Sequence, residues 1–123
     1  MSATIHVDSN LHIISARAEV RTLARKTGFN TMDQARISLA TSSLAYILDL
    51  GGRYGGKITY RVTNNNGAEK IEVSCVAYCG NFDLDLEGQK NKELQKLRKM
   101  VDELHICCLP SNDLEVIMIK NKS

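Results

Sequence analysis

Apolar residues recur along the first part of the chain at the spacing that predicts a helix. Between residues 10 and 27 they return every three or four positions, which places them on one face of a helix. Arg17, Arg21 and Arg25 lie on another face, and Gly28 is the expected end of the helix. The apolar face consists of Ile13, Ala16, Val20, Leu23, Ala24 and Thr27.

A second helix is predicted from Thr31 to about Leu48. Thr31 and Gln34 have the spacing of a capping box, in which two side chains accept hydrogen bonds from free backbone N–H groups. Apolar residues occur nearly all round this helix, so we expect it to be buried in the domain or also against a partner. These residues are Met32, Ala35, Ile37, Leu39, Ala40, Leu44, Ala45, Ile47 and Leu48.

Alternation of apolar and polar residues predicts strands elsewhere in the chain. It occurs at residues 5–7, 58–63 and 71–76, and the sequence Asn-Asn-Asn-Gly at 64–67 predicts a turn between the last two strands. Residues 105–109 and 114–119 predict a closing hairpin.

A third amphipathic helix is predicted after a polar loop at residues 81–89, from the spacing of Leu94, Leu97, Val101 and Leu104. The resulting element order is β-α-α-β-β-α-β-β. This order predicts one α+β domain over residues 1–123, a two-layer sandwich with a mixed, mostly antiparallel sheet and three helices on one face.

Composition narrows the class of protein. The chain has 123 residues, of which 43% are hydrophobic and 24% charged, and its net charge is +2. This charge is too small to indicate binding to nucleic acid or to an anionic membrane. No run of 18 apolar residues predicts a membrane span, and residues 1–6 do not have the pattern of a signal peptide. We therefore expect a cytoplasmic protein with reduced cysteines.

The first two predicted helices carry a resemblance to a known family. The segments that carry it are Ile14-Ser15-Ala16-Arg17, Arg21-x-Leu23-Ala24, Gly28-Phe29 and Asp33-Gln34-Ala35-Arg36-Ile37. They resemble the anti-sigma-factor serine kinases of bacterial stress-response modules, which belong to the histidine-kinase-like ATPase (GHKL, Bergerat-fold) superfamily. The element order is also similar to that of the superfamily, so the resemblance implies a Bergerat-type fold for nearly the whole chain.

The resemblance also implies where nucleotide would bind, and the residues at these positions have changed. The family holds magnesium and phosphate with a Glu and an Asn of the second helix, and these positions correspond to Ser43 and Ile47. The glycine-rich start of the third helix corresponds to residues 91–94, where Glu93 adds a negative charge. An apolar Ile47 cannot ligate magnesium, which prefers oxygen donors.

The adenine-binding motif of the family is changed as well. Its Asp, which accepts a hydrogen bond from the adenine amino group, corresponds to Ala77, and its two glycines correspond to Cys79 and Asn81. Loss of the Asp leaves a donor on bound adenine unpaired, which costs about 1–3 kcal/mol. Loss of the glycines hinders close approach of backbone N–H groups to phosphate. We therefore expect no ATP or magnesium cofactor and no kinase activity.

A protein partner is what the resemblance implies instead. Members of the family bind sigma factors, antagonist proteins of the STAS type or stress-response complexes, and they also form homodimers. Because the first two helices carry the resemblance, Arg17, Arg21, Asp33 and Arg36 are candidates for a partner surface. The alternative is that these four residues form salt bridges within the chain.

Two other functions stay open at this stage. The chain would be an active ATP-binding serine/threonine kinase if the motifs were aligned in another register, with carboxylates among Asp83, Asp85 and Glu87. It would be a small-molecule sensor if the emptied pocket binds another ligand. We expect instead that Tyr46 and Tyr78 fill that pocket.

The cysteines and the basic third helix invite two further interpretations. Cys75, Cys79, Cys107 and Cys108 lack the usual spacing of zinc ligands, so we interpret them as small packed residues and expect no metal. Lysines and an arginine along the third helix are interpreted as a solvated face, because no aromatic residues lie among them to stack on bases.

Overall fold

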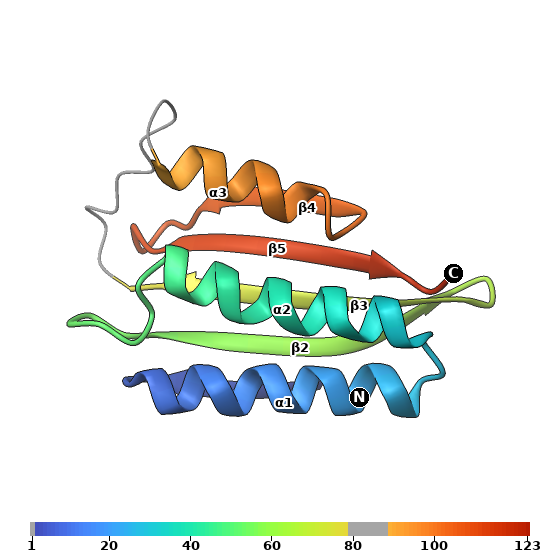
Figure 1. Ribbon diagram of the computed structural model, residues 1–123. Coiled ribbons are helices and arrows are strands. Elements are labelled where there is room, and N and C mark those ends of the chain that lie inside the picture. The colour runs from blue at the N-terminus through green and yellow to red at the C-terminus, as the bar shows by residue number, and fades with distance from the viewer. Residues whose placement is uncertain (1, 79–88) are drawn as a thin grey trace.

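The computed structural model describes residues 2–78 and 89–123, which form a sheet covered on one face by helices (Figure 1). The elements are β1 (Ser2–Val7), α1 (Asn10–Lys26), α2 (Thr31–Ile47), β2 (Gly56–Asn65), β3 (Ala68–Ala77), α3 (Gln89–Arg98), β4 (Glu103–Cys108) and β5 (Leu114–Asn121). Their order is the predicted one, and Figure 1 shows all three helices in front of the sheet. The prediction of a two-layer α+β sandwich is confirmed.

The sheet has the strand order β1-β2-β3-β5-β4. All four pairings between the described strands are antiparallel, so the parallel pairing of a mixed sheet does not occur among them. β5 lies between β3 and β4 because the chain passes through α3 and β4 before it returns along the sheet. β1 and β4 are therefore the two edge strands.

Alternation along the strands explains why only one face of the sheet is covered. Ile58, Ile71, Val73, Cys75, Val116 and Met118 point one way and are fully buried in the core. The opposite face carries polar pairs across the strands. Thr4 and Thr59 share a hydrogen bond of 3.1 Å, and the Ser74 hydroxyl donates to Glu115 over 2.7 Å. These cross-strand pairs satisfy the polar groups of the uncovered face.

α1 follows its prediction closely. Its buried residues are Ile13, Ala16, Val20, Leu23 and Ala24. Gly28 adopts a positive φ of 86°, which glycine tolerates without steric cost. The N–H groups of Gly28 and Phe29 donate to the carbonyls of Arg25 and Ala24, which are left free by the end of the helix.

α2 begins with a different cap from the one predicted. The side chain of Asn30 accepts a hydrogen bond of 2.8 Å from the backbone N–H of Asp33, so Asn30 is the N-cap and Thr31 is the first helical residue. The Gln34 side chain donates to the Phe29 carbonyl instead of closing a capping box on Thr31. Burial within the domain does not extend to Met32, Ala35 and Leu39, which are exposed.

α3 is shorter than predicted. The helix ends at Arg98, a turn follows at residues 99–100, and β4 begins at Glu103. Val101 and Leu104 are buried as the apolar spacing required, but Leu104 reaches the core from β4. The helical spacing of apolar residues therefore extends beyond Arg98, where the helix ends, and this made the predicted helix too long.

Both predicted hairpins are confirmed. Asn66 and Gly67 have φ values of 57° and 82°, as a two-residue type I′ turn between β2 and β3 requires. The second hairpin joins β4 to β5, and the Leu109 N–H donates to the Asp113 carbonyl over 2.8 Å at its base.

Candidate functional site

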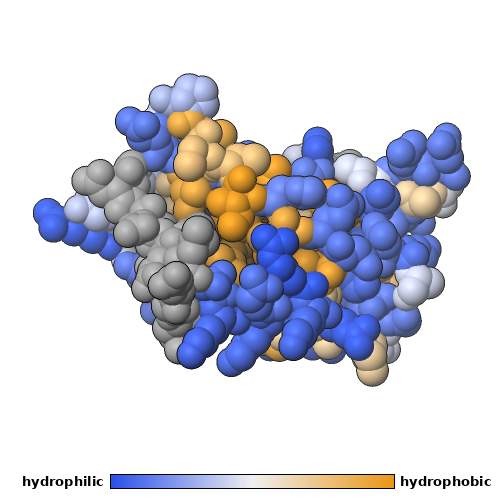
Figure 2. All heavy atoms as spheres, turned by 90° about the horizontal axis from the view of Figure 1, so that it is seen from above, coloured by the Kyte–Doolittle hydropathy of each residue, from blue (hydrophilic) through white to orange (hydrophobic). Residues whose placement is uncertain are grey.

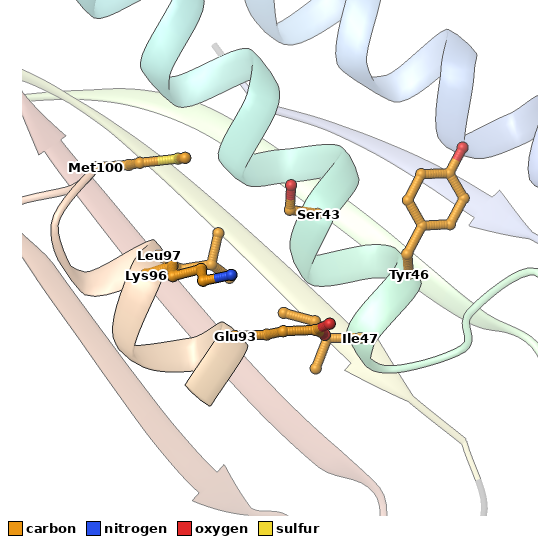
Figure 3. A pocket seen from close by; sticks show the side chains of 7 residues that line it. All are labelled: Ser43, Tyr46, Ile47, Glu93, Lys96, Leu97 and Met100. Atoms are coloured by element: carbon orange, nitrogen blue, oxygen red, sulfur yellow. The ribbon is translucent and has the colours of Figure 1, made fainter. Parts of the chain in front are cut away.

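A cleft between α2 and α3 lies where the resemblance places the nucleotide. It has a volume of about 480 Å³. Its lining consists of Ser43, Tyr46, Ile47, Glu93, Lys96, Leu97 and Met100 (Figure 3). The structure therefore brings together Ser43, Ile47 and Glu93, three of the residues that the sequence placed in a nucleotide pocket.

The chemistry of this cleft differs from that of a magnesium nucleotide site. Ile47 presents an apolar side chain, and Figure 3 shows the Glu93 side chain reaching from α3 toward it. Magnesium requires several oxygen ligands in octahedral geometry, and an isoleucine supplies none. Among the described residues of this lining, Lys96 is the one cation, and it lies beside the apolar Leu97 and Met100.

Of the residues expected on the adenine side of the pocket, the structure describes Ala77. Ala77 does not line the cleft, because it lies at the end of β3 between Gly56 and Leu114 and is 2% exposed. Cys79 and Asn81 lie outside the described residues. The carboxylates that a shifted register would use, residues 83, 85 and 87, lie outside them too.

The two tyrosines do not fill the cleft as expected. Tyr46 is 51% exposed, and Figure 3 shows its ring turned away from α3 toward α1. Tyr78 lies beyond the end of β3, in a separate hollow with His6 and Arg53. Tyr46 thus lines the α2–α3 cleft without its ring filling it, and Tyr78 lines a different hollow.

A second hollow runs between α1 and α2 on the outer face of the helical layer, and we call it the α1–α2 groove. It has a volume of about 330 Å³ and is lined by Ile14, Arg17, Ala18, Arg21, Ser42 and Tyr46. Ile14 is 58% exposed and Tyr46 51% exposed, and Leu11 and Leu39 are exposed on the same two helices. Large apolar side chains that gather on a surface mark an interaction site.

Both charged side chains in the described lining of the α1–α2 groove, Arg17 and Arg21, are positive. Residues 10–47 also contain the acids Glu19 and Asp33. Both acids are engaged away from the groove, because Glu19 accepts a hydrogen bond of 2.7 Å from the Tyr60 hydroxyl and Asp33 is buried. In residues 2–78 and 89–123, neither Arg17 nor Arg21 has an ion-pair partner.

Asp33 does not belong to a partner surface, which corrects its placement from the sequence. It is 3% exposed, and its carboxylate lies 3.4 Å from the Lys120 ammonium and 3.7 Å from the Arg36 guanidinium. The hydroxyl of Ser123 donates to it over 2.6 Å. This hydrogen bond is the main cause that lowers the pKa of Asp33, and Lys120 and Arg36 add to the effect while burial opposes it. For Asp33 the alternative of salt bridges within the chain is correct.

The other three candidates of that surface differ from Asp33. Arg17 and Arg21 line the α1–α2 groove, and Arg36 keeps 48% of its side chain exposed. Sequence reasoning missed the apolar half of the groove. The signal that could have found it is Ile14, an isoleucine that falls outside the buried stripe of α1.

Cysteine positions bear on the metal interpretation. Cys75 is fully buried on β3, and this burial raises the pKa of its thiol to about 12. Cys107 and Cys108 are exposed on β4, and Cys79 lies outside the described residues. Within the described ranges no three His, Cys, Asp or Glu side chains group closely enough to hold a metal ion.

None of the helices in residues 2–78 and 89–123 is long and apolar enough to cross a membrane.

Comparison with models of known protein families gives no match, and comparison with curated protein sequences gives no match either. The resemblance to the anti-sigma serine kinases therefore rests on residues of the chain itself, chiefly those between 13 and 45.

Proposed function

We propose that this chain is a regulatory domain that acts by protein–protein contact, similar to the anti-sigma factor/serine kinases, and that it neither binds ATP nor transfers phosphate. The single observation that carries the proposal is the α1–α2 groove, where exposed Ile14 and Tyr46 lie beside the cations Arg17 and Arg21. The groove lies on the two helices that carry the family resemblance.

The groove offers a partner both apolar area and charge. Burial of apolar surface contributes about 25 cal/mol per Å², and aromatic and arginine side chains are the residues most enriched in binding hot spots. Arg17 and Arg21 are separated by one helical turn and repel each other, so an acidic partner would relieve that repulsion. An acidic protein segment with apolar anchors therefore fits the groove best. A sigma factor, a STAS-type antagonist or a stress-response complex is the kind of partner that the resemblance implies.

Loss of ATP binding is supported by the side chains at the expected nucleotide site. Ile47 replaces a magnesium-binding oxygen, and Ala77 provides no acceptor for adenine. Each such loss costs about 1.5–3 kcal/mol, so three or four together weaken binding more than about a thousandfold. An active kinase would need another set of carboxylates around the cleft.

The experiment that tests the interaction places a photo-crosslinking amino acid at Ile14 in cells that contain the protein. Mass spectrometry then identifies the crosslinked protein, and titration calorimetry measures its affinity for the purified domain. We expect Arg17→Glu and Arg21→Glu each to weaken that affinity at least tenfold. Arg53→Glu changes charge equally but lies on the loop before β2, and it should leave the affinity unchanged.

Two outcomes would contradict the proposed contact. One is the absence of any crosslinked protein at position 14 while crosslinks form from an exposed position elsewhere, such as Tyr54. The other is an identified partner that binds the Arg17→Glu and Arg21→Glu variants as tightly as the unchanged protein.

A second candidate function is a small-molecule sensor, and the open cleft between α2 and α3 favours it. Its volume of about 480 Å³ falls within the usual range of ligand pockets, and it combines Lys96 and Glu93 with apolar walls. A ligand that co-purifies with the protein and is lost on Met100→Lys would support this function, since Met100 lines the cleft. Purified protein without bound ligand in native mass spectrometry would count against it.

A further inference from the structure

β4 is an edge strand that leaves one side open to solvent. Among the described strands it pairs with β5 alone, and Figure 1 shows it at the margin of the sheet behind α3. Figure 2 views the molecule from this margin and shows hydrophobic residues exposed there. Ile106 is 38% exposed, and Cys107 and Cys108 are exposed beside it.

A hydrogen bond at the hairpin end of the pairing between β4 and β5 shows which backbone groups of β4 face outward. The Leu109 N–H donates to the Asp113 carbonyl, which makes these two residues a hydrogen-bonded pair in the register of β4 and β5. Hydrogen-bonded and non-bonded pairs alternate along an antiparallel ladder. The odd-numbered residues of β4 therefore bond to β5, and the even-numbered ones direct their N–H and C=O groups to the open edge.

The pairing of β5 with β3 gives an independent check of which β5 residues bond to β4. The Lys122 N–H donates to the Glu69 carbonyl over 3.1 Å, so even-numbered residues of β5 bond to β3. Odd-numbered residues of β5 are then the ones that bond to β4, which agrees with the assignment from Leu109.

One of the outward groups is already occupied by a side chain of the same molecule. The Arg98 guanidinium reaches from α3 and donates to the Leu104 carbonyl over 3.2 Å. Ile106 and Cys108 have no such partner among the described residues. Residues 106–108 therefore have unpaired backbone groups along the open edge. Proteins often block such edges with proline or charged side chains, and residues 106–108 contain neither.

We propose that this edge pairs with the β4 strand of a second copy of the chain. The two strands run antiparallel about a two-fold axis at Cys107, so that Ile106 of each copy bonds to Cys108 of the other. This register uses the two residues with open backbone groups and leaves the bond between Arg98 and Leu104 intact. A second copy suffices as the partner, because two identical edges that run antiparallel satisfy each other's N–H and C=O groups.

The side chains agree with this register. Residues directly opposite in an antiparallel pair point to the same face, so exposed Ile106 and Cys108 pack together on the helix side of both sheets. His105 lies opposite Leu109 of the other copy, so no like charges oppose each other before the chain turns at residues 110–112. The two Cys107 side chains face each other in a non-bonded pair, where Cα atoms lie about 4.5 Å apart, a separation that a disulfide can bridge.

Sedimentation velocity of the reduced protein over a range of concentrations tests the association. We expect a monomer–dimer equilibrium that shifts to monomer in Ile106→Lys. Tyr54→Lys is the matched control. Tyr54 is also a large exposed residue, but it lies on the loop before β2, so the dimer of this variant should persist. A protein that stays monomeric at every concentration, or an Ile106→Lys variant that dimerises like the unchanged protein, would overturn the proposal.

Oxidation with diamide tests the register. Diamide accepts two hydrogen atoms from two thiols, and the thiols join in a disulfide. We expect a covalent dimer that forms in Cys108→Ser and is lost in Cys107→Ser. The reverse result, a dimer that requires Cys108 and forms without Cys107, would overturn the register. These measurements involve neither the α1–α2 groove nor its partner, so their failure leaves the proposed function untouched.

Discussion

Lys120 of β5 places its ammonium 3.4 Å from the buried Asp33 carboxylate and thereby ties the last strand of the sheet to the start of α2. The same ammonium lies 3.2 Å from Asp102, which precedes β4. Three segments that are distant in the sequence meet at this one cation, so the contact stabilises the packing of the helical layer on the sheet.

Replacement of Asp33 should destabilise the fold. Asp33→Asn removes the negative charge that Lys120 and Arg36 face, and removal of one partner of a buried pair is costly. We expect a loss of about 2–4 kcal/mol in the free energy of unfolding, measured with urea at neutral pH. Arg36→Gln is the control. Its exposed side chain lies 3.7 Å from Asp33 and should contribute less than about 1 kcal/mol.

The same carboxylate gives the stability a dependence on pH. The pKa of Asp33 is lowered in the folded state, so its contribution is fully present above its ordinary pKa of 3.8 and is lost as the pH falls through the lowered value. The difference in unfolding free energy between the unchanged protein and Asp33→Asn should therefore stay constant from pH 7 to about pH 4 and shrink as the pH falls further. A difference that does not shrink below about pH 4 would contradict the assigned role of Asp33.

Tyr60 should lose its phenolic proton at a higher pH than an ordinary tyrosine. Burial and its hydrogen bond to Glu19 raise the pKa of Tyr60 to about 12. Absorbance at the phenolate wavelength should show a step near pH 12 that is missing from Tyr60→Phe. Because the folded-state pKa is raised, the stabilisation is present below about pH 10 and is lost as the pH rises toward 12. Tyr60→Phe should cost about 1 kcal/mol at neutral pH.

Two adjacent isoleucines of α1 differ in burial, because Ile13 lies in the core and Ile14 lines the α1–α2 groove. Ile13 is 0% exposed and Ile14 is 58% exposed. We expect Ile13→Ser to cost about 3 kcal/mol or more in thermal or urea unfolding, because it leaves a cavity and buries a hydroxyl. Ile14→Ser should change stability by no more than about 0.5 kcal/mol. Equal losses in the two variants would show that Ile14 is a packing residue and not part of an exposed groove.

The sequence predicted the parts of the fold that depend on neighbours along the chain. The buried stripe of α1, its end at Gly28 and the Asn66–Gly67 turn all follow from local spacing and backbone preference. The end of α3 could not be predicted in this way. Leu104 keeps the helical spacing of Leu97, although it belongs to a strand that faces the same core.

The candidate site was predictable only in part. Ser43, Ile47 and Glu93 line one cleft. Their meeting could be predicted because it depends only on the order of the helices, which the sequence indicates. The role of Asp33 was not predictable, since its partners Lys120 and Ser123 come from the other end of the chain. Contacts across such a separation depend on the completed fold and leave no local pattern in the sequence.

The most direct test of the central claim is a calorimetric titration of the purified protein with magnesium and ATP, together with its melting temperature at millimolar nucleotide. A ligand at about 100 times its Kd would stabilise the fold by about 2.7 kcal/mol, which raises the melting temperature by several degrees. Our account predicts no heat of binding and no shift in melting temperature. Magnesium-dependent binding in the micromolar range would contradict it and would favour an active ATP-binding kinase.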